Sequence, residues 1–171
     1  RNIKMNKKTK TILIVCGVVN LIALYLISFI QEINYQVAFN SFSFKISNWM
    51  YVFALLMFVG IFISKKSYRS GFILVLICTL SMIIVSPIGI NDAIKIDKQN
   101  NHYEDIYNAI QNVFIGVPQS TASNSSLDFK ETSIKIKQIE AGYVILALSN
   151  SVAIVTLLYS RKQINKSNTK K

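Results

Sequence analysis

Four long stretches without a charged side chain limit what this chain can fold into. They cover residues 11–30, 46–64, 70–91 and 141–160. A helix needs about 20 residues to cross a hydrocarbon core about 30 Å thick, and each stretch is close to that length. With 51% hydrophobic residues, the chain is also more apolar than an ordinary soluble domain. The sequence therefore predicts an all-α membrane protein built on a bundle of four transmembrane helices.

The positions of the charges indicate which side of the membrane each polar segment occupies. Thirteen of the 19 Lys and Arg residues lie in segments 1–10, 65–69 and 161–171, which contain no acidic residue. All eight acidic residues lie in the other two loops, together with six lysines. Cytoplasmic loops carry an excess of Lys and Arg, so we expect a multi-pass protein of the cell membrane with both termini in the cytoplasm. Orientation and attraction to anionic headgroups then account for the net charge of +11, and we expect no nucleic-acid partner.

The charges and the apolar stretches together divide the chain into nine segments. In order these are a cytoplasmic basic N-terminus (1–10), the first span (11–30), an outer loop (31–47), the second span (48–64), a basic cytoplasmic loop (65–69), the third span (70–90), a large outer loop (91–140), the fourth span (141–160) and a basic cytoplasmic tail (161–171).

The first outer loop has a pattern typical of a β-hairpin. Apolar residues alternate with polar ones on both sides of Asn40 and Ser41, at Tyr35, Val37, Phe39, Phe42, Phe44 and Ile46. A period of two predicts strands, and two residues between them fit a hairpin turn. Because a lone hairpin is marginally stable in water, we expect it to be covered by the headgroup region or by the second outer loop.

The second outer loop predicts an amphipathic helix. Pro87 and Gly89 should kink or end the third span before the loop begins. Further along, apolar residues recur every three or four positions, which places them on one helix face. These residues are Tyr103, Ile106, Tyr107, Ile110, Val113 and Phe114. We predict that this face covers the hairpin, and Tyr103, Ile106, Tyr107, Ile110 and Phe114 are the candidate partner-binding face.

The rest of the second outer loop predicts a linker and one short element. Gly116 and Pro118 should end the amphipathic helix, and residues 119–126 contain no apolar side chain larger than alanine, which is typical of a mobile surface linker. Ile134 and Ile136 alternate with lysines after it. A short strand and an early helical entry into the fourth span fit this pattern about equally well. The two outer loops together predict a small extracytoplasmic α+β cap.

Polar side chains within the spans predict a polar layer near the bilayer midplane. Its members are Asn20, Thr79, Ser81, Ser149, Asn150 and Ser151. An unpaired carboxamide is costly in hydrocarbon, so these groups should face one another, with the first, third and fourth spans inside the bundle and the second more peripheral. Hydrogen bonding between helices explains such a layer. A small-molecule or ion site is the alternative.

The sequence lacks the residue sets of common membrane enzymes. A catalytic zinc normally takes three protein ligands, and His102 is the single histidine. Cys16 and Cys78 lie inside spans without a neighbouring cysteine, where the side chain behaves as a small hydrophobe. The spans contain no Asp, Glu, Lys, Arg or His, which argues against a proton-coupled pump. We therefore expect no enzyme activity, no cofactor and no bound metal.

These patterns predict a non-catalytic recognition or accessory protein, such as an immunity, sensory or regulatory subunit, that meets a protein or peptide partner through its outer loops. A transport or channel component lined by the polar layer is the alternative. An enzyme that acts on a lipid or wall precursor through Glu104 or Asp105 is a third hypothesis. Homo-oligomers and hetero-oligomers fit equally well. The abundance of Ile, Lys and Asn favours a bacterial source.

Overall fold

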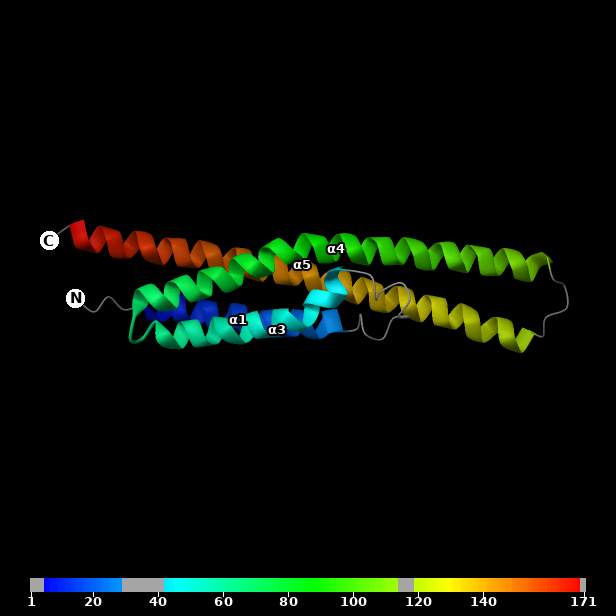
Figure 1. The fold of residues 1–171 in the computed structure, drawn as a ribbon, viewed down its shortest axis with the longest axis horizontal. Coiled ribbons are helices and arrows are strands. Elements are labelled where there is room, and N and C mark those ends of the chain that lie inside the picture. The colour runs from blue at the N-terminus through cyan, green and yellow to red at the C-terminus, as the bar shows by residue number, and fades with distance from the viewer. Residues whose placement is uncertain (1–4, 29–41, 114–118, 170–171) are drawn as a thin grey trace.

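The computed structural model describes residues 5–28, 42–113 and 119–169 of the chain. Over these ranges the chain forms four helices and no strand: α1 (Lys7–Ser28), α3 (Phe42–Ile63), α4 (Tyr68–Val113) and α5 (Gln119–Thr169). Figure 1 shows them as an elongated bundle. A helix satisfies its backbone hydrogen bonds internally, which hydrocarbon surroundings require of a spanning segment.

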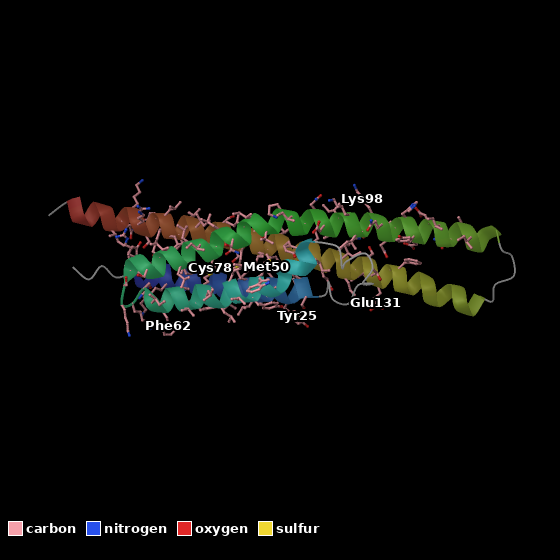
Figure 2. The ribbon with its side chains drawn as sticks, viewed as in Figure 1. Tyr25, Met50, Phe62, Cys78, Lys98 and Glu131 are labelled. Carbon is pink, nitrogen blue, oxygen red and sulfur yellow. The ribbon has the colours of Figure 1, made fainter. Side chains whose placement is uncertain are left out.

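Three of the described helices contain a segment long and apolar enough to cross a membrane. The helical stretches that contain such a segment are Lys7–Ser28 in α1, Tyr68–Ile110 in α4 and Phe129–Ile164 in α5. The apolar segment recorded for α3, Trp49–Ile63, is shorter. Apolar side chains also cover the outside of the bundle, where Tyr25 and Phe62 are exposed, whereas Met50 and Cys78 lie between the helices (Figure 2).

The four helices are arranged in a ring. α5 packs against α1 and α4, and α3 also packs against both of these helices. The first residues of α1, the turn between α3 and α4, and the end of α5 lie at the same end of the molecule (Figure 1). Successive helices are therefore antiparallel, as in a bundle whose helices are joined in up-and-down order.

The α3 and α4 backbones lie in close contact at Gly60 and Gly71. A Cβ atom added to Gly71 would lie 2.5 Å from the Gly60 carbonyl oxygen and 2.5 Å from the Ser64 nitrogen. Residues without a side chain allow helices in a membrane to approach closely, and the resulting backbone contacts replace a hydrophobic driving force between them. Glycine at position 71 therefore sets the spacing of this helix pair.

α4 runs from Tyr68 to Val113 as one helix, so of the two outcomes expected at residues 86–89, a kink or an end, the end of the helix is wrong. Pro87 lies inside the helix. A proline removes one backbone donor, but neighbouring side chains can stabilise the helix around it. The buried Ser86 hydroxyl donates a 2.7 Å hydrogen bond to the Met82 carbonyl one turn back. Gly89 allows the Tyr143 ring of α5 to pack directly against the α4 backbone, which strengthens the helix pair at this level.

Beyond α1 and α3, the two longest helices continue as an arm that widens towards its far end (Figure 1), defined here as residues 91–113 of α4 and 119–140 of α5. Its first part has an apolar seam formed by the buried residues Ala93, Ile96, Ile136 and Ile139. Polar contacts follow further along the arm. Ser133 donates a 3.2 Å hydrogen bond to the Asp97 carboxylate, and the Asn100 amide donates one of 3.2 Å to the Phe129 carbonyl.

Several expectations about the outer loops are wrong because helix replaces the predicted strand or linker. Phe42, Phe44 and Ile46 lie in the first turns of α3. The other half of the predicted hairpin, with Asn40 and Ser41, falls outside the described residues. Residues 119–126, expected to form a linker, belong to α5. The described part of the two loops that were expected outside is therefore helical, and the α+β cap is not confirmed.

The segment around Ile134 is also helical, which decides between the two alternatives for it. Ile136 and Ile139 are buried, and Tyr143 and Leu146 continue the same face at intervals of three and four residues. Ile134 is exposed. The alternation of isoleucine with lysine had indicated a strand over four residues, but the longer helical period extends through the fourth span and determines the structure.

Candidate functional site

A pair of asparagines joins α1 to α5 in the middle of the bundle. The Asn20 amide donates to the Asn150 carboxamide oxygen at 3.1 Å, and the Asn150 amide donates to the Asn20 oxygen at the same distance. Both side chains are 0% exposed. Such a reciprocal pair gives each carboxamide one donor contact and one acceptor contact, which offsets much of the cost of removing it from water.

Two methionines complete the surroundings of this pair. The Met57 sulfur of α3 lies 3.7 Å from the Asn20 amide nitrogen, and the Met82 sulfur of α4 lies 3.7 Å from that of Asn150. The Asn150 amide also donates to the Leu146 carbonyl at 2.8 Å. A thioether is a weak hydrogen-bond acceptor, so each sulfur contributes less than the amide pair. Each of the four helices therefore supplies one fully buried side chain at this level.

The other members of the predicted polar layer are divided between the helix interface and individual helices. The Ser149 hydroxyl crosses to α1, where it donates to the Cys16 carbonyl at 3.1 Å. Thr79 is buried but bonds within α4, to the carbonyls of Val75 and Leu76. Ser81 and Ser151 likewise bond to carbonyls one turn back on their own helices. The structure thus brings together Asn20, Ser149 and Asn150.

The expectation that the second span is peripheral is wrong. α3 contributes Met50, Ala54, Met57 and Ile61 to the buried core, at intervals of three and four residues. The Tyr51 hydroxyl also donates a 2.8 Å hydrogen bond to the Leu24 carbonyl of α1. Met57 and Met82 were missed as neighbours of the asparagines because a methionine in an apolar stretch carries no sign of polar contact. The buried-face periodicity of alanine and methionine in the second span is the signal that could have placed Met57 inside.

The arm carries the second candidate site. Tyr103, Ile106 and Ile110 are 54%, 42% and 52% exposed, so the described part of the predicted partner-binding face is open on the surface. The side chain of Tyr107 is not among those described, and Phe114 falls outside the described residues. Asn101, Asp105 and Asn108 lie on the opposite side of α4, because residues two positions away are separated by about 200° around a helix.

The sequence explains why this apolar stripe is exposed. Nearer the bundle, Ile96 of α4 is buried beside the seam residues of α5. Further along, the register of the Asn100–Phe129 contact sets Ile106 and Ile110 opposite residues 119–124 of the antiparallel α5, which contain no apolar side chain larger than alanine. Burial stabilises in proportion to the apolar area removed from water, and this segment offers little of it. Among the described residues, the two helices of the arm therefore bury apolar side chains against each other only in the half of the arm that is nearer the bundle.

The described charged side chains of the arm do not form a metal-binding cluster. Among the described residues, no group of three or more His, Cys, Asp or Glu side chains is placed to hold a metal ion. Glu131 forms a 3.0 Å salt bridge with Lys135 one turn along α5. In Figure 2, Glu131 and Lys98 lie on the outer sides of the two arm helices. His102 stands beside Tyr103, with ring centroids 6.4 Å apart.

Comparison of the chain with protein-family models, with curated proteins and with solved structures finds no significant match. The geometry of the bundle and of the arm is therefore the basis for a functional assignment.

Proposed function

We propose that this chain is a non-catalytic recognition or accessory protein of a bacterial cell membrane, and that its arm binds a protein partner outside the cytoplasm. The observation that carries the proposal is the continuity of α4 and α5. Both helices pass from an apolar bundle into a polar arm without a break, and the arm exposes an apolar stripe. A bundle of this kind holds a recognition element at a fixed distance from the membrane.

The placement of the bundle in the membrane has two supports. Three helices contain segments long and apolar enough to span, and α3, which packs between α1 and α4, would be the fourth span. The basic segments without acidic residues lie at the end of the bundle opposite the arm, which favours a cytoplasmic position for that end and for both termini. The arm would then extend about 35 Å from the outer surface, at 1.5 Å per residue of α4.

The chemistry of the stripe favours a protein partner. Tyrosine is enriched where protein interfaces concentrate their binding energy, and apolar residues at intervals of three and four are how one helix face contacts a groove or another helix. Tyr103, Ile106 and Ile110 have this spacing and are exposed. An apolar patch that the protein itself leaves open is a typical interaction site.

The asparagine pair supports a structural role for the polar layer over a transport path. A path needs polar groups that can exchange partners with a passing solute. Asn20 and Asn150 are instead bonded to each other and enclosed by Met57 and Met82, with 0% exposure for all four side chains. Interhelical hydrogen bonds of this kind in membrane proteins contribute about 0.6 kcal/mol each.

Photo-crosslinking in the native membrane tests the proposed role of the arm. A photoreactive amino acid at position 103, 106 or 110 should give one discrete crosslinked product of higher mass, identified by mass spectrometry as the same protein from all three positions. Positions 101, 105 and 108 supply the matched control on the opposite side of the same helix. Equal crosslinking from both sides, or none from the stripe, would refute a specific partner on this face.

A further inference from the structure

Eight described basic side chains gather at the end of the bundle opposite the arm. They belong to the start of α1, the turn between α3 and α4 with the first residues of α4, and the last part of α5: Lys7, Lys8, Lys10, Lys65, Lys66, Arg69, Arg161 and Lys162. We infer that this basic end is a binding surface for the phosphate headgroups of anionic phospholipids. The inference requires insertion of the bundle in a membrane, but it does not depend on the role of the arm.

Contacts within the bundle place the three basic segments at one level. Met82 is opposite Asn150 and Gly89 is opposite Tyr143, so each step forward on α4 matches a step back on α5. Continuing this register towards the start of α4 sets Arg69 at the same level along the bundle as Arg161 and Lys162. The Asn20–Asn150 contact, continued in the same way along α1, sets Lys8 at the same level as these two residues.

The charges at this end have no acidic residue nearby to balance them. Residues 1–28, 42–91 and 141–171 contain no Asp or Glu. Like charges held at one level repel one another, and the repulsion is relieved when an anion binds between them. The guanidinium groups of Arg69 and Arg161 also suit a phosphate, because the planar group can donate two parallel hydrogen bonds to it.

The basic side chains border the apolar outer surface of the bundle, as a lipid headgroup would require. Phe62 and Tyr159 are exposed next to the basic residues of the turn and of α5. The Lys65 ammonium lies over the Phe62 ring, 4.4 Å from its centre, so a positive charge is held against the exposed apolar surface by a cation–π contact. A phospholipid has the same arrangement of an anionic group above an apolar chain. A soluble anion would interact with the basic side chains but not with the apolar surface beside them.

The arm end of the bundle differs in this respect and supplies an internal control. Lys95, Lys98 and Lys137 are exposed there, but Asp92, Asp97 and Glu140 lie within the same turns of α4 and α5. Replacing these three lysines changes the net charge of the protein by the same amount as replacing three basic residues of the turn. Any effect specific to the basic end is thereby separated from an effect of total charge.

Spin-labelled lipids measure the preference directly. The full-length protein in phosphatidylcholine bilayers should associate with labelled phosphatidylglycerol about fivefold more strongly than with labelled phosphatidylcholine, the ratio that corresponds to about 1 kcal/mol. The variant K65Q/K66Q/R69Q, and separately K8Q/R161Q/K162Q, should each lose most of this preference. The variant K95Q/K98Q/K137Q should keep it. In 1 M NaCl, where the Debye length is about 3 Å, the wild-type preference should fall towards one.

Four outcomes would overturn the inference. These are no preference in the wild-type protein, an equal loss in the K95Q/K98Q/K137Q control, an unchanged preference in both basic-end variants, and loss of the preference to inorganic phosphate at constant ionic strength. The last would indicate a soluble anion as the ligand. Retardation of a DNA duplex by a protein without lipid preference would instead favour a nucleic-acid partner. Helical content measured by circular dichroism confirms that each variant is folded.

Discussion

Asn20 and Asn150 donate to each other's carboxamide oxygen at 3.1 Å, although they are 130 positions apart in the chain. The contact joins the first helix of the bundle to the last. Both partners must be at the same level for the reciprocal geometry, so the pair fixes the register of α1 against α5. The register in turn determines which residues of the two helices lie together at the basic end.

The two asparagines should not be equally sensitive to replacement by leucine, which has the same branched shape. In Asn150→Leu, the Asn20 amide keeps only the Met57 sulfur as an acceptor. In Asn20→Leu, the Asn150 amide keeps the Leu146 carbonyl as well as the Met82 sulfur. An unsatisfied buried polar group costs about 1–3 kcal/mol. We expect Asn150→Leu at the upper end of that range and Asn20→Leu at the lower end, measured as the free energy of unfolding in mixed micelles.

The double variant Asn20→Leu/Asn150→Leu separates the effect of losing the hydrogen-bonded pair from the effect of changing the side-chain packing. With both carboxamides removed, no polar group is left without its partner, so the double variant should be less destabilised than the sum of the two single variants. If the destabilisation of the double variant equalled the sum of the two single variants, the two asparagines would not act as a unit.

Gly71→Ala should destabilise the protein by about 1–3 kcal/mol, the usual cost of added volume at a tight contact. The new methyl group would meet the backbone of α3 at Gly60 and Ser64, so the two helices must move apart. Gly17→Ala is the matched control. There the new methyl group would lie 2.6 Å from the outer end of the Phe58 ring, and that side chain can rotate away. A Gly17 variant as unstable as the Gly71 variant would contradict this account of helix spacing.

Ile136 and Ile134 form a second matched pair, on α5 within the arm. Ile136 is buried in the seam, and Ile134 is 51% exposed. Ile136→Ala should cost about 2–5 kcal/mol of local stability and accelerate amide hydrogen exchange across residues 91–100 and 129–140, because the seam joins the two arm helices there. Ile134→Ala should leave exchange unchanged. Equal acceleration by both would mean that the seam is not where the arm is held together.

The proposed orientation in the membrane predicts a clear labelling pattern in intact cells. Asn108 on the arm and Gln163 near the end of α5 are both exposed. A membrane-impermeant thiol reagent should modify Asn108→Cys and leave Gln163→Cys unmodified until the cells are opened. The native Cys16 and Cys78 are buried and should not react. Modification of residue 163 alone would place the termini outside.

The helical class and the apolar segments could be predicted because hydrocarbon restricts a spanning chain so strongly. The asparagines could also be expected to meet, since an isolated carboxamide is costly there. Local patterns were less reliable next to the spans. The alternation at Phe42, Phe44 and Ile46 indicated a strand, but the helix formed by the following apolar residues extends through it. Extension adds one hydrogen bond per residue to an existing helix and avoids the cost of a new nucleus.

Pro87 as a possible end of the helix and the serine-rich segment 119–126 as a linker were misleading for a similar reason. Taken alone, a proline usually ends or kinks a helix, and a serine-rich segment is typical of a linker. In the structure, α4 continues through Pro87, with the Ser86 hydroxyl bonded one turn back and Tyr143 packed on Gly89. The contacts of Met57 and Met82 with the asparagines depend on how four helices are rotated towards one another. Nothing in the sequence close to either methionine encodes that rotation.

The central claim is that α4 leaves the membrane as one continuous helix and forms the arm. A nitroxide scan along exposed positions 84, 88, 94, 98, 102 and 106 of α4, in liposomes, tests it most directly. Labels at 84 and 88 should be relaxed mainly by oxygen and labels from 98 onward mainly by a water-soluble nickel complex, and a denser scan should show a period of about 3.6 residues throughout. A label at 106 that is as oxygen-accessible as the one at 84, or a helical period that ends at Pro87, would contradict the account.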